Sequence, residues 1–143
     1  MKVIAVSGYF DPLHIGHIEL FKLAKALGDK LIVIVNNNEQ TEMKKGKYFM
    51  HVEERAKIIQ ELACVDEVFI SVDKDRTVRE SLRTVKPHIF ANGGDRRNDE
   101  IPEAVICREL GIEIVDGLGN KIQSSSELVK RFYEKQEGNQ LAN

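Results

Sequence analysis

The stretch Gly8-Tyr9-Phe10-Asp11-Pro12-Leu13-His14-Ile15-Gly16-His17 decides the fold that we expect for this chain. Residues 3–6, a short continuous apolar run, precede it and predict a buried strand. Residues 18–27 follow it with apolar side chains at helical spacing. Two imidazoles, a carboxylate and two glycines therefore lie where a first strand passes into a first helix. Such a junction gathers free backbone N–H groups and the positive end of a helix dipole, which together favour phosphate.

The same order of segments recurs along the rest of the chain. Apolar runs predict further strands at residues 31–35, 67–72, 87–91 and 112–115. Helical patterns lie at 14–27, 52–62, 77–85 and 101–110, and a last helix begins near Ser124. This alternation predicts the α/β class, with a single-domain, doubly wound (Rossmann-like) parallel five-stranded sheet and helices on both faces. We expect one domain over residues 1–143, with its core at about 3–133 and a polar tail at 134–143.

Several helix ends carry their own signals. Gly28 is a plausible C′ residue of the first helix, and Asp75 is a candidate cap for the helix at 77–85. Ser124 and Glu127 have the spacing of a capping box. The polar segment 36–47 is interpreted as a loop. Because parallel strands end at one edge, we expect the polar segments after strands one, two and four to meet there.

The composition excludes several classes of protein. The chain has 143 residues, of which 42% are hydrophobic and 31% charged, and its formal net charge is −2. This balance gives no strong attraction for nucleic acid or for an anionic membrane surface. No apolar stretch approaches the roughly 20 residues of a membrane span, and no signal segment is evident. Cys64 and Cys107 lie far apart, which suits buried, reduced thiols in a cytoplasmic protein.

His14 and His17 are the first candidates for chemistry. Three residues apart at a helix start, they lie on the same side and can both donate hydrogen bonds to phosphoryl oxygens. Gly16 leaves room for a ligand to approach the backbone. One alternative is a pair of ordinary surface or capping histidines. A zinc site is a weaker alternative, because it needs further ligands.

Other candidates follow the later strands. Lys44, Lys45 and Lys47 follow the second strand and suit phosphate, although a charge run is also typical of a solvated face. Gly93 and Gly94 allow a ligand to approach the backbone closely, and Asp95 follows them with a carboxylate, although a glycine turn with a solvated aspartate is the plain alternative.

Four segments in the expected order resemble one family. The stretch 8–17 resembles the signature of the cytidylyltransferase-like nucleotidyltransferases. Residues 65–68, 90–95 and 123–128 resemble, respectively, a strand, the glycine-rich loop after the fourth strand and the serine/threonine helix start of that family. The resemblance covers about residues 3–130, nearly the whole chain.

The resemblance implies an enzyme that transfers a nucleoside monophosphate from a nucleoside triphosphate to a small phosphorylated acceptor, such as a sugar or polyol phosphate, and releases pyrophosphate. It implies catalytic roles for four residues: His14, His17, Lys44 and Arg55. It implies substrate or nucleotide contacts for a larger set: Tyr9, Phe10, Asp11, Gly16, Lys47, Gly93, Asp95, Arg96, Ser124, Ser125 and Ser126. It also implies Mg²⁺, held mainly through phosphates with Asp11 or Asp95 as possible ligands, and a homodimer.

Plain structural roles compete with some of these assignments. Asp11 before Pro12 is also typical of a helix N-cap, and Arg55 among glutamates is also typical of an exposed ion pair. For Ser124 alone, capping explains the residue as well as binding does.

The base and the acceptor stay open at the level of sequence. The chain has no tryptophan, and residues 117–121 lack the arginine found in glycerol-3-phosphate cytidylyltransferases. Residues 73–77 and the double glycine are more similar to heptose-phosphate adenylyltransferases, whereas Lys121 and Ile122 are not. CTP is the donor we expect first, with ATP as the alternative. A non-catalytic nucleotide-binding module is a further alternative, and an aminoacyl-tRNA synthetase fragment is disfavoured by length and charge.

Overall fold

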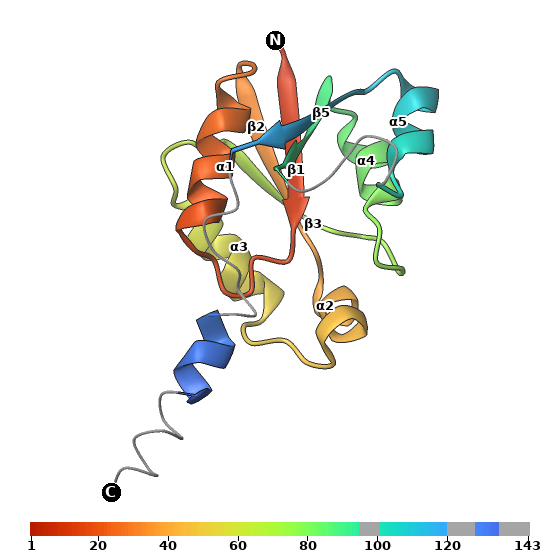
Figure 1. The fold of residues 1–143 in the computed structure, drawn as a ribbon. Coiled ribbons are helices and arrows are strands. Elements are labelled where there is room, and N and C mark those ends of the chain that lie inside the picture. Colours follow the sequence, from red (N-terminus) through yellow and green to blue (C-terminus); the bar gives the residue numbers. More distant parts are fainter. Residues whose placement is uncertain (95–100, 120–127, 135–143) are drawn as a thin grey trace, which may run out of the picture.

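The sheet is parallel and its strands do not follow chain order. The structure, a computed structural model, describes residues 1–94, 101–119 and 128–134. Its strands are β1 (Val3–Gly8), β2 (Lys30–Val35), β3 (Glu67–Ile70), β4 (Ile89–Gly93) and β5 (Glu113–Leu118). They lie in the order β3-β2-β1-β4-β5 (Figure 1). The chain therefore fills one side of β1 first and then crosses to the other.

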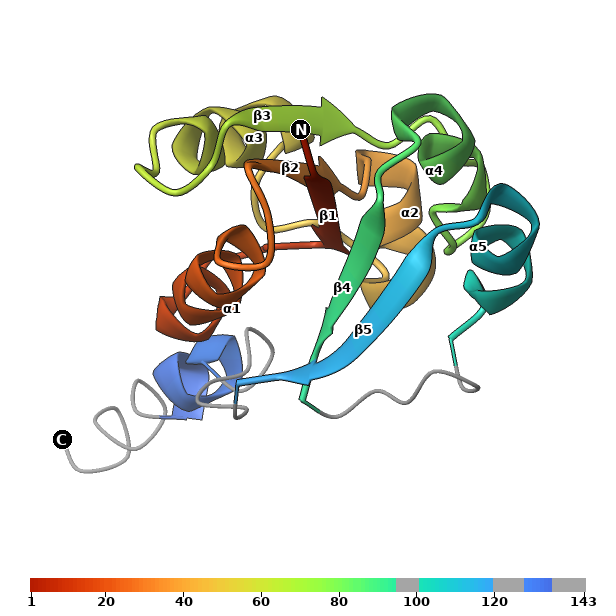
Figure 2. The same ribbon diagram turned by 90° about the horizontal axis from the view of Figure 1, so that it is seen from above.

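Helices cover both faces of this sheet, which confirms the predicted fold class. α1 (Ile15–Lys25) and α3 (Val52–Gln60) pack on one face. α4 (Arg79–Val85) and α5 (Ala104–Leu110) pack on the opposite face (Figure 2). Residues 128–134 are also helical. None of the helices within the described ranges has the length and the apolar run needed to cross a bilayer.

Alternation along the strands divides the core in two. Val6 and Val33 point toward α1 and α3, where they join Phe21. Ala5 and Ile34 point toward α4 and α5. Successive strand residues face opposite sides of a sheet, so a strand covered on both faces is apolar at every position. This is why continuous apolar runs in the sequence located the strands correctly.

The second core cluster contains one of the two cysteines. Cys107 is fully buried, and desolvation raises the pKa of its thiol to about 11. Cys64 is half-buried, and neither cysteine forms a disulfide. Cys107 therefore serves the core as a small apolar side chain.

The predicted loop at 36–47 is wrong, because α2 (Asn38–Lys45) occupies most of it. The Asn37 side chain accepts from the Gln40 N–H at 2.9 Å, and the Gln40 side chain accepts from the Asn37 N–H at 3.0 Å. Gly46, with φ of 83°, ends the helix. An Asn-x-x-Gln capping box was the missed signal. α2 lies beyond the carboxyl ends of β1 and β2 (Figure 1).

The predicted cap of α4 is also wrong. Asp75 accepts from the Thr77 N–H, before the helix, and Val78 is the N-cap without a side-chain bond. Asp73 supplies the cap instead, accepting from the N–H groups of Glu80 at 2.7 Å and Ser81 at 2.9 Å. The predicted capping box at Ser124 and Glu127 lies outside the described residues.

Gly28 is needed for space and not as a C′ residue. α1 ends at the C-cap Ala26, and Gly28 is not in the left-handed region. A Cβ atom at Gly28 would lie 2.8 Å from both the Lys2 carbonyl oxygen and the Ile4 side chain. The turn after α1 therefore passes tightly over the start of β1.

We predict that Gly28→Ala lowers the free energy of unfolding by about 1–3 kcal/mol, because the backbone oxygen cannot move away without disturbing β1. Gly93→Ala is the matched control, since a Cβ atom there meets nothing within 4 Å. Urea denaturation of both variants measures the difference. Equal stabilities would contradict the close-approach explanation.

Candidate functional site

A cavity opens where the carboxyl ends of β1 and β4 meet, at the point where the strand order reverses. It has a volume of about 260 Å³ and is lined by Ser7, Gly8, Tyr9, Phe10, His17, Leu20, Lys44, Lys45, Ala91, Asn92 and Gly93. We call it the β1–β4 cavity. Ligands of open α/β sheets bind at such switch points. The structure thus brings the predicted His17, Lys44 and Gly93 to one place.

Backbone hydrogen bonds fix the orientation of both motif histidines. His14 is the N-cap of α1, and its Nδ1 accepts from the Gly16 N–H at 3.1 Å. Nδ1 of His17 accepts from the His14 N–H, also at 3.1 Å. The two rings stack with centroids 3.7 Å apart. The spacing of the motif is therefore that of a capping box built from two imidazoles.

These contacts determine which tautomer the histidines carry. Since each Nδ1 accepts a backbone N–H, the ring proton of the neutral form lies on Nε2. Desolvation, helped by His14 and Lys45, lowers the pKa of His17 to about 3. Burial also lowers the pKa of His14. Near neutral pH the pair consists of two uncharged imidazoles, each with its ring N–H at Nε2, and of the two only His17 lines the β1–β4 cavity.

We predict that His17 makes the fold sensitive to mild acid. The pKa of His17 is about 3 in the folded protein, against its ordinary value of 6.5. The neutral ring therefore contributes fully to the stability of the fold above pH 6.5, and this contribution is lost as the pH falls toward 3. Between pH 7 and pH 5 this linkage amounts to about 2 kcal/mol at most. Urea denaturation of wild type and His17→Asn at both pH values measures it, because Asn keeps an acceptor for the His14 N–H. An identical pH dependence in the two proteins would contradict the assignment.

The side chain of Phe10 packs against His17. Its backbone lies in the left-handed region, with φ of 51°, and its side chain is buried. The ring meets those of His17 and Phe21 edge-on at centroid distances of 4.9 Å and 5.2 Å. A Cβ atom on Gly8 would lie 2.7 Å from this ring, so Gly8 leaves room for it. Phe10 also lines the β1–β4 cavity, so its expected contact with substrate stays a prediction.

Asp11 is buried and organises the loop before α3. Its two carboxylate oxygens accept from the N–H groups of Phe49 at 2.6 Å and Met50 at 2.7 Å. It is not the cap of α1, because His14 fills that position. Asp11 also lines a cavity of about 560 Å³ together with Lys47, and its expected contact with substrate or metal stays a prediction.

Arg55 corrects the sequence interpretation most clearly. It was expected either to contact substrate phosphate or to lie exposed beside glutamates, but it is 1% exposed. Its Nη1 donates to the carbonyls of Tyr9 at 2.7 Å and Asn36 at 2.8 Å. Nε donates to the Met50 carbonyl, and Nη2 to the Asn38 side chain. Arg55 therefore joins the ends of β1 and β2 to α2 and α3.

We predict that Arg55→Lys lowers the free energy of unfolding by about 2–4 kcal/mol, because one ammonium cannot reach acceptors arranged for a guanidinium fork. Arg83→Lys is the control, since Arg83 makes exposed ion pairs that contribute little. Chemical denaturation compares the two. A loss at Arg55 no larger than that at Arg83 would show that the buried network is dispensable.

Lysines at the end of α2 supply positive charge to the site. The Lys44 ammonium lies 4.4 Å from the centre of the Tyr9 ring. Lys45 donates to the Asp11 carbonyl at 2.9 Å, and desolvation lowers the pKa of its ammonium. Both line the β1–β4 cavity, and both also line a second cavity of about 560 Å³, which Lys47 lines beside Tyr48 and Tyr133. Lys45, which was not preferred from sequence, is therefore as well placed as Lys44.

Sequence reasoning missed Asn92. This residue precedes Gly93, the last residue of β4, and lines the β1–β4 cavity. It is 6% exposed, and its Nδ2 has no partner among the described residues. Its position directly before Gly93 was the available signal. The remaining candidates, Asp95, Arg96, Ser124, Ser125 and Ser126, lie outside the described residues.

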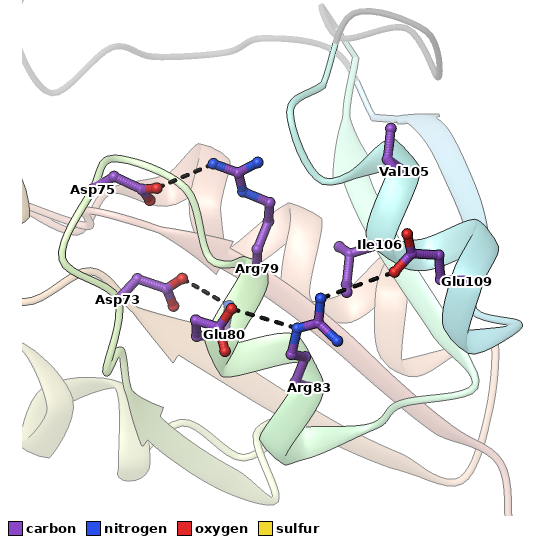
Figure 3. A pocket seen from close by; sticks show the side chains of 8 residues that line it. All are labelled: Asp73, Asp75, Arg79, Glu80, Arg83, Val105, Ile106 and Glu109. Atoms are coloured by element: carbon purple, nitrogen blue, oxygen red, sulfur yellow. Dashed lines mark hydrogen bonds and ion pairs between the residues drawn. The ribbon is translucent and has the colours of Figure 1, made fainter.

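Another cavity, of about 290 Å³, lies between α4 and α5 on the opposite face (Figure 3). Its charges neutralise one another: Arg79 pairs with Asp75 at 3.1 Å, and Arg83 pairs with Glu80 at 3.4 Å. The carboxylate of Asp73 accepts from backbone N–H groups in the first turn of α4. Because these groups satisfy one another, we place no ligand site there.

Metal ligands are scarce in the described part of the chain. No group of three or more histidine, cysteine, aspartate or glutamate side chains is placed to hold an ion there. The zinc alternative for His14 and His17 consequently lacks further ligands among these residues.

Comparisons with known proteins agree with this geometry. A model of the family described as Cytidylyltransferase-like matches residues 5–132. The bifunctional protein HldE of Desulfatibacillum aliphaticivorans is 38% identical over 123 residues, which are 85% of this chain and 23% of that protein. The FAD synthase of Pyrococcus abyssi is 35% identical over 112 residues, 78% of this chain and 75% of that protein.

A solved structure supports the same relationship. The lipopolysaccharide core biosynthesis protein from Thermoplasma volcanium GSS1 has a TM-score of 0.67 and 30% identity, with 81% of this chain and 95% of that chain covered. The HldE relatives are much longer, and this chain spans about a quarter of their length.

Proposed function

The chain belongs to the cytidylyltransferase-like family of nucleotidyltransferases, and from this premise we propose that it transfers a nucleoside monophosphate to a small phosphorylated acceptor. We further propose ATP as the donor in place of CTP. The similarity to an FAD synthase supports this change, because FAD carries an adenylyl group. Pyrophosphate is the second product.

The neutral histidine pair is the observation that carries the proposal. An oxygen of the acceptor's phosphate attacks the α-phosphorus and forms a new P–O bond. The bond from the α-phosphorus to the bridging oxygen breaks, and its electron pair leaves with pyrophosphate. The nucleophile is already ionised, since the second pKa of a phosphate monoester is about 6. No general base is needed, so the Nε2–H groups act as donors to phosphoryl oxygens.

Charge neutralisation comes from the neighbouring lysines. Lys44 and Lys45 line the β1–β4 cavity with His17, and Asn92 adds an amide donor. Mg²⁺ would be held mainly by the triphosphate oxygens and would supply further charge neutralisation when bound. The role of this chain's own residues is to align the two anions and balance the charge that develops between them.

We predict that His17→Asn lowers kcat by about 10²- to 10³-fold, as removal of one transition-state donor does. Asn preserves the acceptor for the His14 N–H while removing the Nε2–H donor. Pyrophosphate release, measured with each of the four common nucleoside triphosphates and a panel of phosphorylated acceptors, is the assay. We expect ATP to support the reaction.

His51→Gln is the matched control. His51 is exposed at the start of α3 and lines none of the cavities described above. We expect it to retain wild-type kcat. Near-normal turnover in the folded His17→Asn protein, or the absence of acceptor-dependent pyrophosphate release with any triphosphate, would overturn the proposed chemistry.

A further inference from the structure

The largest of the three cavities described above has no part in the proposed reaction. It has a volume of about 560 Å³, against about 260 Å³ for the β1–β4 cavity, and lies in the size range of small-molecule sites. Its walls come from three segments of the chain that are far apart in sequence. We call it the aromatic cavity, and it is lined by Asp11, Lys44, Lys45, Lys47, Tyr48, Phe49, Val129 and Tyr133.

Three aromatic side chains give this cavity apolar walls. Phe49 is 65% exposed and Tyr133 is 57% exposed, so both rings present much of their surface to solvent. Tyr48 is half-buried, and its ring lies beside that of His51 with the centroids 4.9 Å apart. Exposed aromatic side chains gathered around one hollow are typical of a binding site, because a ligand is needed to bury them. A planar ring placed against them would remove this apolar surface from water.

The charged side chains of the aromatic cavity are mainly positive. Three lysines line it, whereas Asp11 is the one acidic residue that lines it within the described ranges. Both carboxylate oxygens of Asp11 already accept backbone N–H groups. Lys47 makes no ion pair with another residue that the structure describes. This excess of positive charge favours an anionic ligand.

Two of these lysines also line the β1–β4 cavity. Lys44 and Lys45 are the last two residues of α2 and form part of both walls. Anions bound in the two cavities at once would share the same ammonium groups and repel each other. Binding in one cavity therefore weakens binding in the other, and the effect is reciprocal.

We propose that the aromatic cavity is an effector site for a planar aromatic phosphate. The ring packs against Phe49 and Tyr133, and the phosphate is received by Lys47 together with the two lysines at the end of α2. The occupant is an inhibitor, because its charge opposes that of a triphosphate in the β1–β4 cavity. The binding itself is independent of the proposed function, whereas the inhibition rests on it.

Binding is tested with FMN, a fluorescent planar aromatic phosphate, in the absence of ATP. Riboflavin carries the same ring system without a phosphate, and inorganic phosphate carries no ring. We expect riboflavin to bind at least about tenfold more weakly than FMN, because it lacks the charge-assisted contacts to the lysines. Inorganic phosphate at the same concentration should not displace FMN. Equal affinities for FMN and riboflavin, or displacement by phosphate alone, would contradict the proposed ligand chemistry.

Tyr133→Ala and Phe49→Ala remove aromatic walls at exposed positions, where folding is not at risk. Each should raise the Kd for FMN about fivefold or more, as the loss of one stacked ring does. Phe132→Ala is the matched control, since Phe132 is 58% exposed in the same helix and does not line the cavity. We expect its Kd to stay within about twofold of wild type. Equal affinities in all of these proteins would locate FMN elsewhere.

Inhibition is tested in the pyrophosphate assay with ATP and an acceptor that supports turnover. Saturating FMN should raise the apparent KM for ATP about threefold or more and leave kcat unchanged, because it opposes binding and not the chemical step. Tyr133→Ala should show wild-type constants without FMN and should lose the response to FMN. This loss distinguishes the aromatic cavity from direct competition in the β1–β4 cavity, which Tyr133 does not line.

Three results would overturn the effector role while leaving the proposed function intact. Binding of FMN with no change in the KM for ATP would refute the coupling. A raised KM for ATP in Tyr133→Ala without FMN would make the cavity part of the nucleotide site. Pyrophosphate release that requires FMN and falls in Tyr133→Ala would make it an acceptor site. Failure of every acceptor with every triphosphate would instead refute the proposed function and would not alter the binding result.

Discussion

The site depends on one buried guanidinium. Arg55 donates to carbonyls at the ends of β1 and β2, to the loop before α3 and to a side chain of α2. These segments are far apart in sequence, and Arg55 gives each of them a hydrogen-bond donor. Asp11 complements the network by accepting two backbone N–H groups from the same loop. Both residues hold the walls of the cavities in place and neither is positioned as a reactant.

The fold was predictable because its signals are local. A strand buried on both faces is apolar at each position, as in β2, and the alternation of strands with helices implies a parallel sheet. The same argument predicted that the functional site lies at the carboxyl ends of the strands. Helix boundaries were less secure, since α2 and the cap of α4 depend on side-chain bonds that periodicity does not reveal.

The roles of individual site residues were harder to predict. Sequence identified the histidines, the lysines and Gly93 at the end of β4, all of which reach one cavity except Lys47 and His14. The resemblance implied that Arg55 and Asp11 contact substrate, whereas both are buried and hydrogen-bond to the backbone of the chain itself. Their partners lie up to 46 residues away along the chain, and only the folded arrangement shows which polar groups neutralise one another. Asn92 was missed for the same reason.

The two histidines fix the direction of their ring N–H donors but carry no net charge near neutral pH. Because a backbone amide occupies each Nδ1, the rings orient a donor without contributing a net positive charge. The attraction for anions is left to lysines on a short helix outside the sheet. If the proposed function holds, substitutions in that helix would change how strongly a substrate is held and would leave the orientation of the histidine donors intact. A fold organised in this way can change its substrate affinity in evolution while preserving its catalytic geometry.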